Sequence, residues 1–161
     1  MCWQCDNPQA TEADYEAWLW DTIDRYGWAI QYVEPGRTAP SFAYTVGLSR
    51  YAEPELVVTG MRQERAGALL NKMAAHVLAV STPWAGEHVQ HEGDPLVEFI
   101  ELSEPTAHLY MAVALFGAQI RALQVVYCDD RGHWPWHRGY RGGRGGQPVL
   151  GPRAGVSRDH R

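Results

Sequence analysis

Ala122-Leu123-Gln124-Val125-Val126-Tyr127-Cys128 is a strongly apolar run rich in β-branched and aromatic side chains. This composition predicts a β-strand that is covered on both faces and lies near the centre of a sheet. Similar runs bounded by turn residues predict five further strands. They cover residues 28–33, 41–48, 55–59, 87–91 and 96–102.

Helical spacing of apolar residues predicts three helices between these strands. The first begins at Thr11-Glu12-Ala13-Asp14, which has the form of a capping box, and ends before Gly27. The second covers residues 63–80 and carries one apolar stripe. The third lies between Ser103, which we expect to cap it, and Gly117, which follows its end.

The resulting order is α-β-β-β-α-β-β-α-β. Runs of strands separated by single helices favour an α+β fold over a strict βαβ repeat. We therefore expect residues 1–137 to form a single globular α+β domain, in which a mixed or mostly antiparallel sheet packs with about three helices. Residues 138–161 form a Gly/Arg-rich C-terminal tail, which we expect to be partly ordered against the domain.

Composition places the chain among ordinary globular proteins. It has 161 residues, of which 45% are hydrophobic and 20% are charged, so wholesale disorder is excluded. No apolar run reaches the roughly 18–20 residues that cross a bilayer, so no membrane partner is expected. The opening residues 1–6 lack the basic and apolar segments of a secretory signal, and we expect a cytoplasmic protein.

Charge is distributed unevenly along the chain. Residues 1–120 carry 6 basic and 16 acidic groups, a balance of −10, whereas residues 121–161 carry 8 arginines and 3 aspartates, a balance of +5. An acidic body argues against nucleic acid as a partner, because phosphate recognition needs clustered positive charge. The exception is the segment 138–146, where arginines alternate with glycines around Tyr140. A flexible, solvated tail is the favoured interpretation of this segment.

Several short motifs follow one another along the chain. They are Met1-Cys2-Trp3-Gln4-Cys5-Asp6, Tyr26-Gly27-Trp28, Tyr44-Thr45-Val46-Gly47-Leu48, Pro54-Glu55-Leu56-Val57-Val58, Leu69-Leu70-Asn71, Ala122-Leu123-Gln124-Val125-Val126 and Asp130-Arg131-Gly132 with Trp134-Pro135-Trp136. Together, in this order, they resemble a bacterial, mainly actinobacterial, domain of unknown function, number 4262. The resemblance extends from Cys2 to about Gly151, and it implies a single-domain bacterial protein without assigning any site residue.

Cysteines and histidines near the two ends of the chain form a candidate zinc site. Cys2 and Cys5 have the spacing at which two thiolates bind one tetrahedral zinc. Cys128, His133 and His137 follow the last strand and would complete the coordination. The alternative is that the cysteines are free thiols and that the histidines are solvated loop residues.

Polar and aromatic residues at strand ends form a candidate ligand crevice. Such groups commonly gather around ligands at the edge of a sheet. The alternative is that the aromatic residues belong to the core or its rim, and that Asp129 and Asp130 cap a turn. The candidate ligand-binding residues are Tyr44, Thr45, Glu55, Asp130, Trp134 and Trp136.

Three functions are compatible with these sites. The first is a binding or regulatory module that takes a small molecule or peptide in an aromatic crevice. The second is a metal-dependent, hydrolase-like enzyme that uses Asp129, Asp130 or His133. The third is a structural-zinc domain whose function is a protein contact, and a homo-oligomer is a further expectation.

Overall fold

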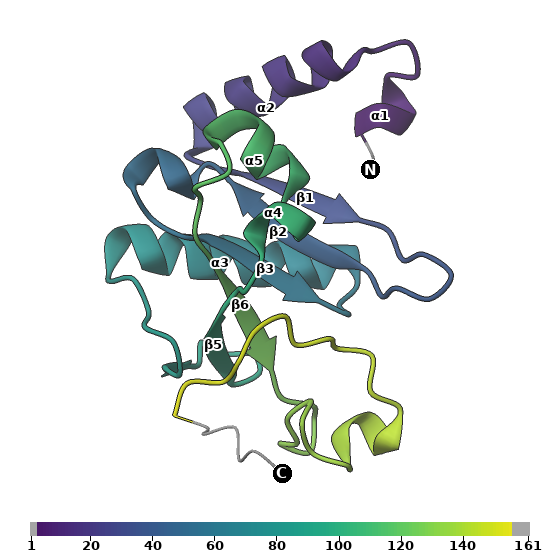
Figure 1. Cartoon of the computed structure of the whole chain (residues 1–161), viewed down its shortest axis with the longest axis vertical. Helices are drawn as coiled ribbons and strands as arrows, with labels where there is room; N and C mark the ends of the chain where they lie inside the picture. The colour runs from purple at the N-terminus through teal and green to yellow at the C-terminus, as the bar shows by residue number, and fades with distance from the viewer. Residues whose placement is uncertain (1–2, 156–161) are drawn as a thin grey trace.

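The structure is a computed structural model that describes residues 3–155 (Figure 1). Six strands form one sheet in the order β1-β2-β3-β6-β5-β4. The strands are β1 (Ala29–Val33), β2 (Phe42–Val46), β3 (Glu55–Thr59), β4 (His88–Val89), β5 (Val97–Glu101) and β6 (Ala122–Tyr127). The helices are α1 (Trp3–Asp6), α2 (Glu12–Tyr26), α3 (Gln63–Ala79), α4 (Pro105–His108) and α5 (Tyr110–Phe116), with short 3-10 turns η1 (Leu48–Tyr51) and η2 (Tyr140–Gly143).

Strand β6 is central, as its composition predicts. It pairs parallel with β3 and antiparallel with β5, and all six of its residues are buried. The remaining pairs are antiparallel, so the sheet is mixed. The α+β fold class is therefore confirmed.

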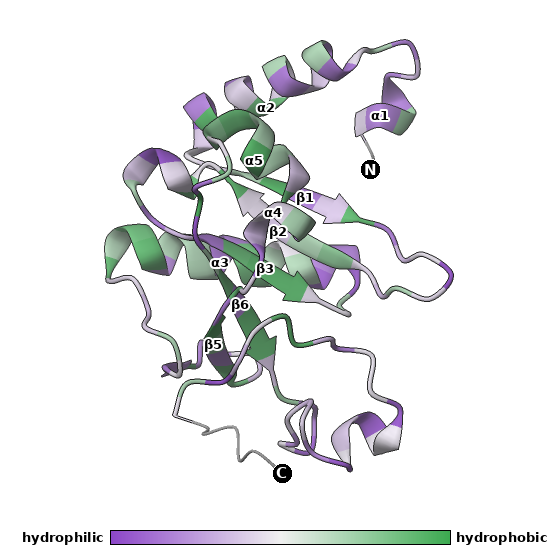
Figure 2. Ribbon diagram, in the orientation of Figure 1, coloured by the Kyte–Doolittle hydropathy of each residue, from purple (hydrophilic) through white to green (hydrophobic). Residues whose placement is uncertain are grey.

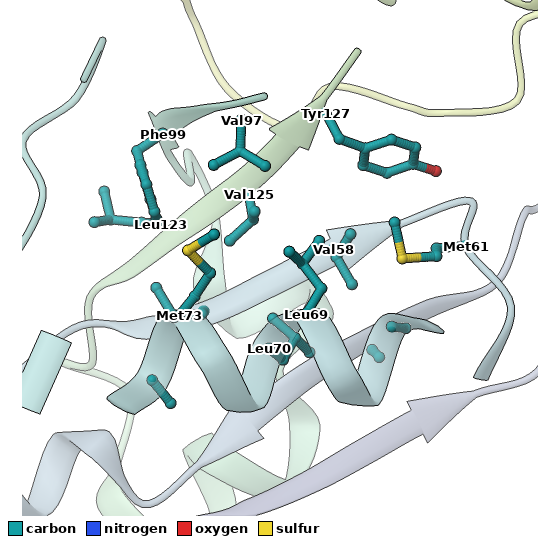
Figure 3. Close-up of a cluster of buried hydrophobic side chains, with 14 of the residues drawn as sticks. Val58, Met61, Leu69, Leu70, Met73, Val97, Phe99, Leu123, Val125 and Tyr127 are labelled. Atoms are coloured by element: carbon teal, nitrogen blue, oxygen red, sulfur yellow. The ribbon is translucent and has the colours of Figure 1, made fainter. Parts of the chain in front are cut away.

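Two apolar cores lie on the two faces of the sheet. On one face, α3 places Leu69, Leu70 and Met73 against Val58 and Leu123 of the strands (Figure 3). On the other face, α2, α4 and α5 cover the β1–β2–β3 half of the sheet (Figure 1). Hydrophobic residues are concentrated in the central strands, and the segment after β6 is largely polar (Figure 2).

The structure confirms the predicted start of the first long helix and corrects the prediction for the third. The capping box at Thr11 and Asp14 is present, with both reciprocal hydrogen bonds. The third predicted helix is divided into α4 and α5, because Leu109 leaves helical geometry (φ −100°, ψ 58°) and buries its side chain completely. Ser103 does not cap it, since Glu104 occupies the cap position and makes no side-chain capping bond.

Much of the predicted tail lies against the sheet. Tyr140 and Gln147 are 1% and 5% exposed. The Gln147 amide pairs with the main chain of Tyr127: it accepts from the N–H over 3.0 Å and donates to the carbonyl over 2.9 Å. Gln124 of β6 makes a similar pair of bonds to the main chain of the C-terminal segment. Its amide donates to Pro148 O and accepts from the Leu150 N–H, both over 2.7 Å.

Close backbone contacts fix the path of this segment. A Cβ atom on Gly60 would lie 1.9 Å from the carbonyl oxygen of Gly146, and one on Gly151 would lie 2.0 Å from that of Glu101. Real Cβ contacts are never this short, so both positions require glycine. Among the residues that the structure describes, no helix is long and apolar enough to cross a membrane.

Candidate functional site: a groove at the open edge of the sheet

Glu55 and Thr45, two of the candidate ligand-binding residues, are turned inward. Both are 0% exposed. The Glu55 carboxylate accepts hydrogen bonds from Thr45 Oγ1 (2.5 Å), the Gly47 N–H (2.9 Å) and both the N–H and hydroxyl of Ser49 (3.0 and 2.9 Å). Burial raises the pKa of Glu55, and these hydrogen bonds oppose the increase. The carboxylate therefore holds the turn after β2 in place.

Tyr44 is also an internal residue. Its ring is 1% exposed, and its hydroxyl accepts the N–H of Met111 over 2.9 Å at the start of α5. The first N–H groups of a helix have no partner within the helix, so this bond satisfies one of them. Burial raises the pKa of Tyr44. Its role in this structure is to join the sheet to α5.

The structure does not bring the two halves of the predicted crevice together. Glu55 lies opposite Ala122, at the start of β6. Asp130, Trp134 and Trp136 follow the other end of this strand. Since a strand rises about 3.3 Å per residue, the length of β6 separates the two groups.

Trp134 and Trp136 belong to a cluster of side chains that contact one another in a closed circuit. Their indoles stack with centroids 5.3 Å apart, and His88 lies 5.3 Å from Trp134. The Arg153 guanidinium lies 3.7 Å from the centre of the Trp136 ring. Glu98 completes the cluster by accepting hydrogen bonds from Arg153 (3.0 and 3.1 Å) and from His88 (2.8 Å). This cluster attaches the C-terminal segment to β4 and β5.

Two opposing effects set the pKa of Glu98 in this cluster. The carboxylate is 4% exposed. Burial raises its pKa, but the hydrogen bonds and positive charge of Arg153, with those of His88, outweigh burial and lower the pKa overall. The ion pair is thus held in its charged form.

Asp129 organises the loop after β6. Its carboxylate accepts the backbone N–H groups of Arg131 (2.9 Å), His133 (2.8 Å) and Arg141 (2.8 Å). Burial opposes ionisation, but these bonds prevail and lower the pKa of Asp129 to about 2. Asp130 is exposed. Asp129 therefore fixes a turn, which was the alternative interpretation of this pair.

The candidate zinc ligands are dispersed. His133 and His137 lie with ring centroids 6.3 Å apart, and Cys128 follows β6 directly. Cys5 is on α1, at the opposite end of the molecule from the loop after β6 (Figure 1). Cys2 lies outside the described residues. Within residues 3–155, no three His, Cys, Asp or Glu side chains are grouped as metal ligands would be.

A large hollow lies elsewhere, around the open edge of β1. It has a volume of about 750 Å³ and adjoins a second hollow of about 390 Å³, with which it shares lining residues. We call the two hollows together the β1 groove. The shared lining consists of Trp3, Gln4, Tyr15, Gln31 and Val33.

An aromatic cluster from α1 and α2 forms one wall of the β1 groove. Tyr15 and Trp18 are three positions apart on α2 and stack at 5.6 Å. The short helix α1 places Trp3 against both rings, at 5.2 Å from Tyr15 and 5.8 Å from Trp18. The Tyr15 hydroxyl donates to Gln31 Oε1 of β1 and so connects this wall to the strand.

The other wall is built by α3 on the opposite face of the sheet. Ile30 and Tyr32 of β1 point to this face and pack partly against the α3 core. Gln63, Gly67 and Asn71 complete the lining. A Cβ atom on Gly67 would meet no atom within 4 Å, so the helix leaves open space there.

The aromatic residues Trp3, Tyr15 and Trp18 are the one sequence signal for the β1 groove. Tyr15 and Trp18 lie at helical spacing in the predicted helix that begins at Thr11 and ends before Gly27, and this spacing alone does not show whether they face the core or a groove. Trp18 is only half-buried in the structure, as is Trp3. Large aromatic rings at the end of a stripe, beside a third in the opening residues, mark a surface hollow as readily as a core.

Comparison with known proteins identifies the family of the chain. No curated protein and no solved structure was found to match it. Residues 22–141 match a family described as "Domain of unknown function (DUF4262)". This segment includes all six strands and α3, whereas Trp3, Tyr15 and Trp18 precede it. Because the match covers well over half of the chain, the protein belongs to the DUF4262 family.

Proposed function

We propose that the domain is a binding module that takes an extended peptide along the open edge of β1. The observation that carries this proposal is the position of the β1 groove, whose lining includes residues from both faces of an edge strand. An edge strand presents N–H and C=O groups to which another strand can add. Addition of a peptide strand to such an edge is a recurring mode of recognition.

Alternation along β1 supports this mode of binding. Ala29 and Val33 face the α2 core, and Ile30 and Tyr32 face the α3 core. A strand added beside β1 would alternate in the same way, because successive side chains point to opposite faces. Its side chains would therefore enter the aromatic wall and the α3 wall in turn.

The polar lining favours binding over catalysis. Gln4, Gln31, Gln63 and Asn71 all contribute amides to the larger hollow. Amides donate and accept hydrogen bonds without titrating in the physiological range, which suits recognition of peptide groups. A small molecule is the second occupant to consider, since a volume of about 750 Å³ is within the usual range of ligand pockets.

The test is selection from a library of random eight-residue peptides, followed by affinity measurement on a variant that fills the groove. Gly67→Leu places a side chain in the open space of the α3 wall, and it favours the helix, since glycine is a poor helix former. Ala68→Leu, at the next and exposed position of α3, is the matched control.

Selected peptides should bind the native protein and Ala68→Leu equally, and bind Gly67→Leu at least about tenfold more weakly, a difference of about 1.4 kcal/mol. Backbone amides of β1 should become protected from hydrogen exchange on binding. Failure of the library to yield any binder, or equal binding to Gly67→Leu, would overturn the proposal.

A further inference from the structure

We propose that the peptide bound in the β1 groove is anchored by a cationic side chain, arginine or lysine. This inference rests on the proposed function and names the chemistry that the groove selects. It follows from the charges and the ring faces that surround the groove, and from an arginine site that the same chain builds elsewhere.

The charged residues that line the β1 groove are both acidic. Within residues 3–155, the lining of the larger hollow includes Glu34 and that of the smaller includes Glu12, and both are exposed. The elements around them reinforce this charge. Residues 3–34, which comprise α1, α2 and β1, contain seven acidic residues and one basic residue, a balance of −6. Such a field attracts cations and repels anions before contact.

The aromatic wall offers the second component of a cation site. The face of an aromatic ring is negative, and a guanidinium or ammonium group within about 6 Å of its centre is attracted to it. Trp3 and Trp18 are half-buried, so part of each indole remains open toward the groove. The amide oxygen of Gln4, and the second lone pair of Gln31 Oε1, which already accepts from Tyr15, add hydrogen-bond acceptors for the N–H groups of the cation.

The chain already assembles these components around one of its own arginines. At the opposite end of the molecule, the Arg153 guanidinium lies 3.7 Å from the Trp136 ring and donates two bonds to Glu98. Indole and carboxylate together hold that arginine in place. The β1 groove presents indoles and carboxylates without an arginine of its own among the described lining residues. A basic side chain of a partner peptide supplies the missing component.

The first test is the composition of the peptides selected from the random library. The inference requires arginine or lysine to be enriched at one position among the selected sequences. Selection of tight binders that lack basic residues would overturn the inference and leave the proposed function standing. A library that yields no binders would instead overturn the proposed function itself.

The second test isolates the charge of the anchor. The tightest arginine-containing peptide is compared with a copy in which citrulline, the neutral analogue of arginine, replaces the anchor. We expect the citrulline peptide to bind at least about tenfold more weakly at low salt, with the difference decreasing as salt screens the carboxylates. Equal binding of the two peptides would overturn the inference.

Variants assign the effect to the groove. In the double variant Glu12→Gln/Glu34→Gln, the preference for arginine over citrulline should fall below about threefold, because the side chains keep their shape but lose their charge. The control Glu92→Gln/Asp130→Asn removes the same two charges from exposed positions, in the turn between β4 and β5 and in the loop after β6, and should retain the full preference. An equal loss in both variants would show that only net charge matters and would overturn the inference.

A second copy of the chain is the competing occupant of an open strand edge. Sedimentation of the protein alone, at low and high concentration, distinguishes it. A monomer that binds the selected peptide supports the inference. A dimer that Gly67→Leu dissociates would show that the groove is an interface between copies, and would overturn it.

Discussion

Replacement of Gln147 by leucine tests whether the C-terminal segment is an integral part of the fold. The side chain makes three bonds: two to the main chain of Tyr127, over 3.0 and 2.9 Å, and one to the Tyr140 hydroxyl over 2.6 Å. Leucine has a similar volume but cannot form them. It would leave the N–H and C=O of Tyr127 without these partners in the interior, at a cost of about 1–3 kcal/mol each. Burial of the added apolar surface offsets roughly 1 kcal/mol of that cost.

The expected loss is therefore about 3 kcal/mol in the free energy of unfolding, a large part of the roughly 5–15 kcal/mol that stabilises a typical domain. Urea unfolding followed by circular dichroism measures it. With a slope of about 2 kcal/mol per molar, the midpoint should fall by about 1.5 M. Gln90→Leu is the control, since Gln90 is exposed and donates to Asp94 O over 3.3 Å. A loss below about 0.5 kcal/mol for Gln147→Leu would refute the reasoning.

Three further predictions concern other polar contacts of the fold. Since the native pKa of Asp129 is lowered from 3.8 to about 2, its contribution to stability is present above pH 4 and is lost as the pH falls toward 2. Thermal melts of Asp129→Asn should accordingly show a smaller decrease over that range than those of the native protein, and equal decreases would contradict this. Arg153→Met leaves Glu98 buried with one cationic partner fewer, so stability should fall by about 2 kcal/mol and the pKa of Glu98 should rise, as NMR titration would show. Tyr44→Phe removes the bond to the Met111 N–H and should cost about 1 kcal/mol, with faster hydrogen exchange at that amide; unchanged exchange would exclude the capping role.

The sheet was largely predictable because its strands carry strong local signals. β6 and β3 consist of buried residues with high strand propensity, and both strands were expected within one residue of their observed ends. The α2 cap was predictable for a similar reason, since Thr11 and Asp14 lie within one turn of each other. The break at Leu109 was not, because it goes with a buried side chain and with the bond from the Met111 N–H to the hydroxyl of Tyr44, 67 residues earlier in the chain.

The location of the β1 groove could not be predicted from the sequence. Polar residues at strand ends indicate a ligand crevice only if their side chains face outward, and Glu55 and Thr45 face each other. The parallel register of β3 and β6 then places Glu55 away from Asp130, which single-strand patterns do not reveal. The β1 groove depends on which strand occupies the edge of the sheet, a property of topology and not of local sequence.

The stacked tryptophans of the C-terminal segment also give the protein an optical signal of its own. The Trp134 and Trp136 rings are nearly parallel, with 7° between their planes and 5.3 Å between their centres. At this separation the electronic transitions of two indoles couple, and any in-plane twist between the two rings gives the coupling a paired positive and negative band in the ultraviolet circular dichroism spectrum. The pair is held between His88 and Arg153, so release of the segment would separate the rings. Without any attached label, the amplitude of that band would report whether the segment is docked on the sheet.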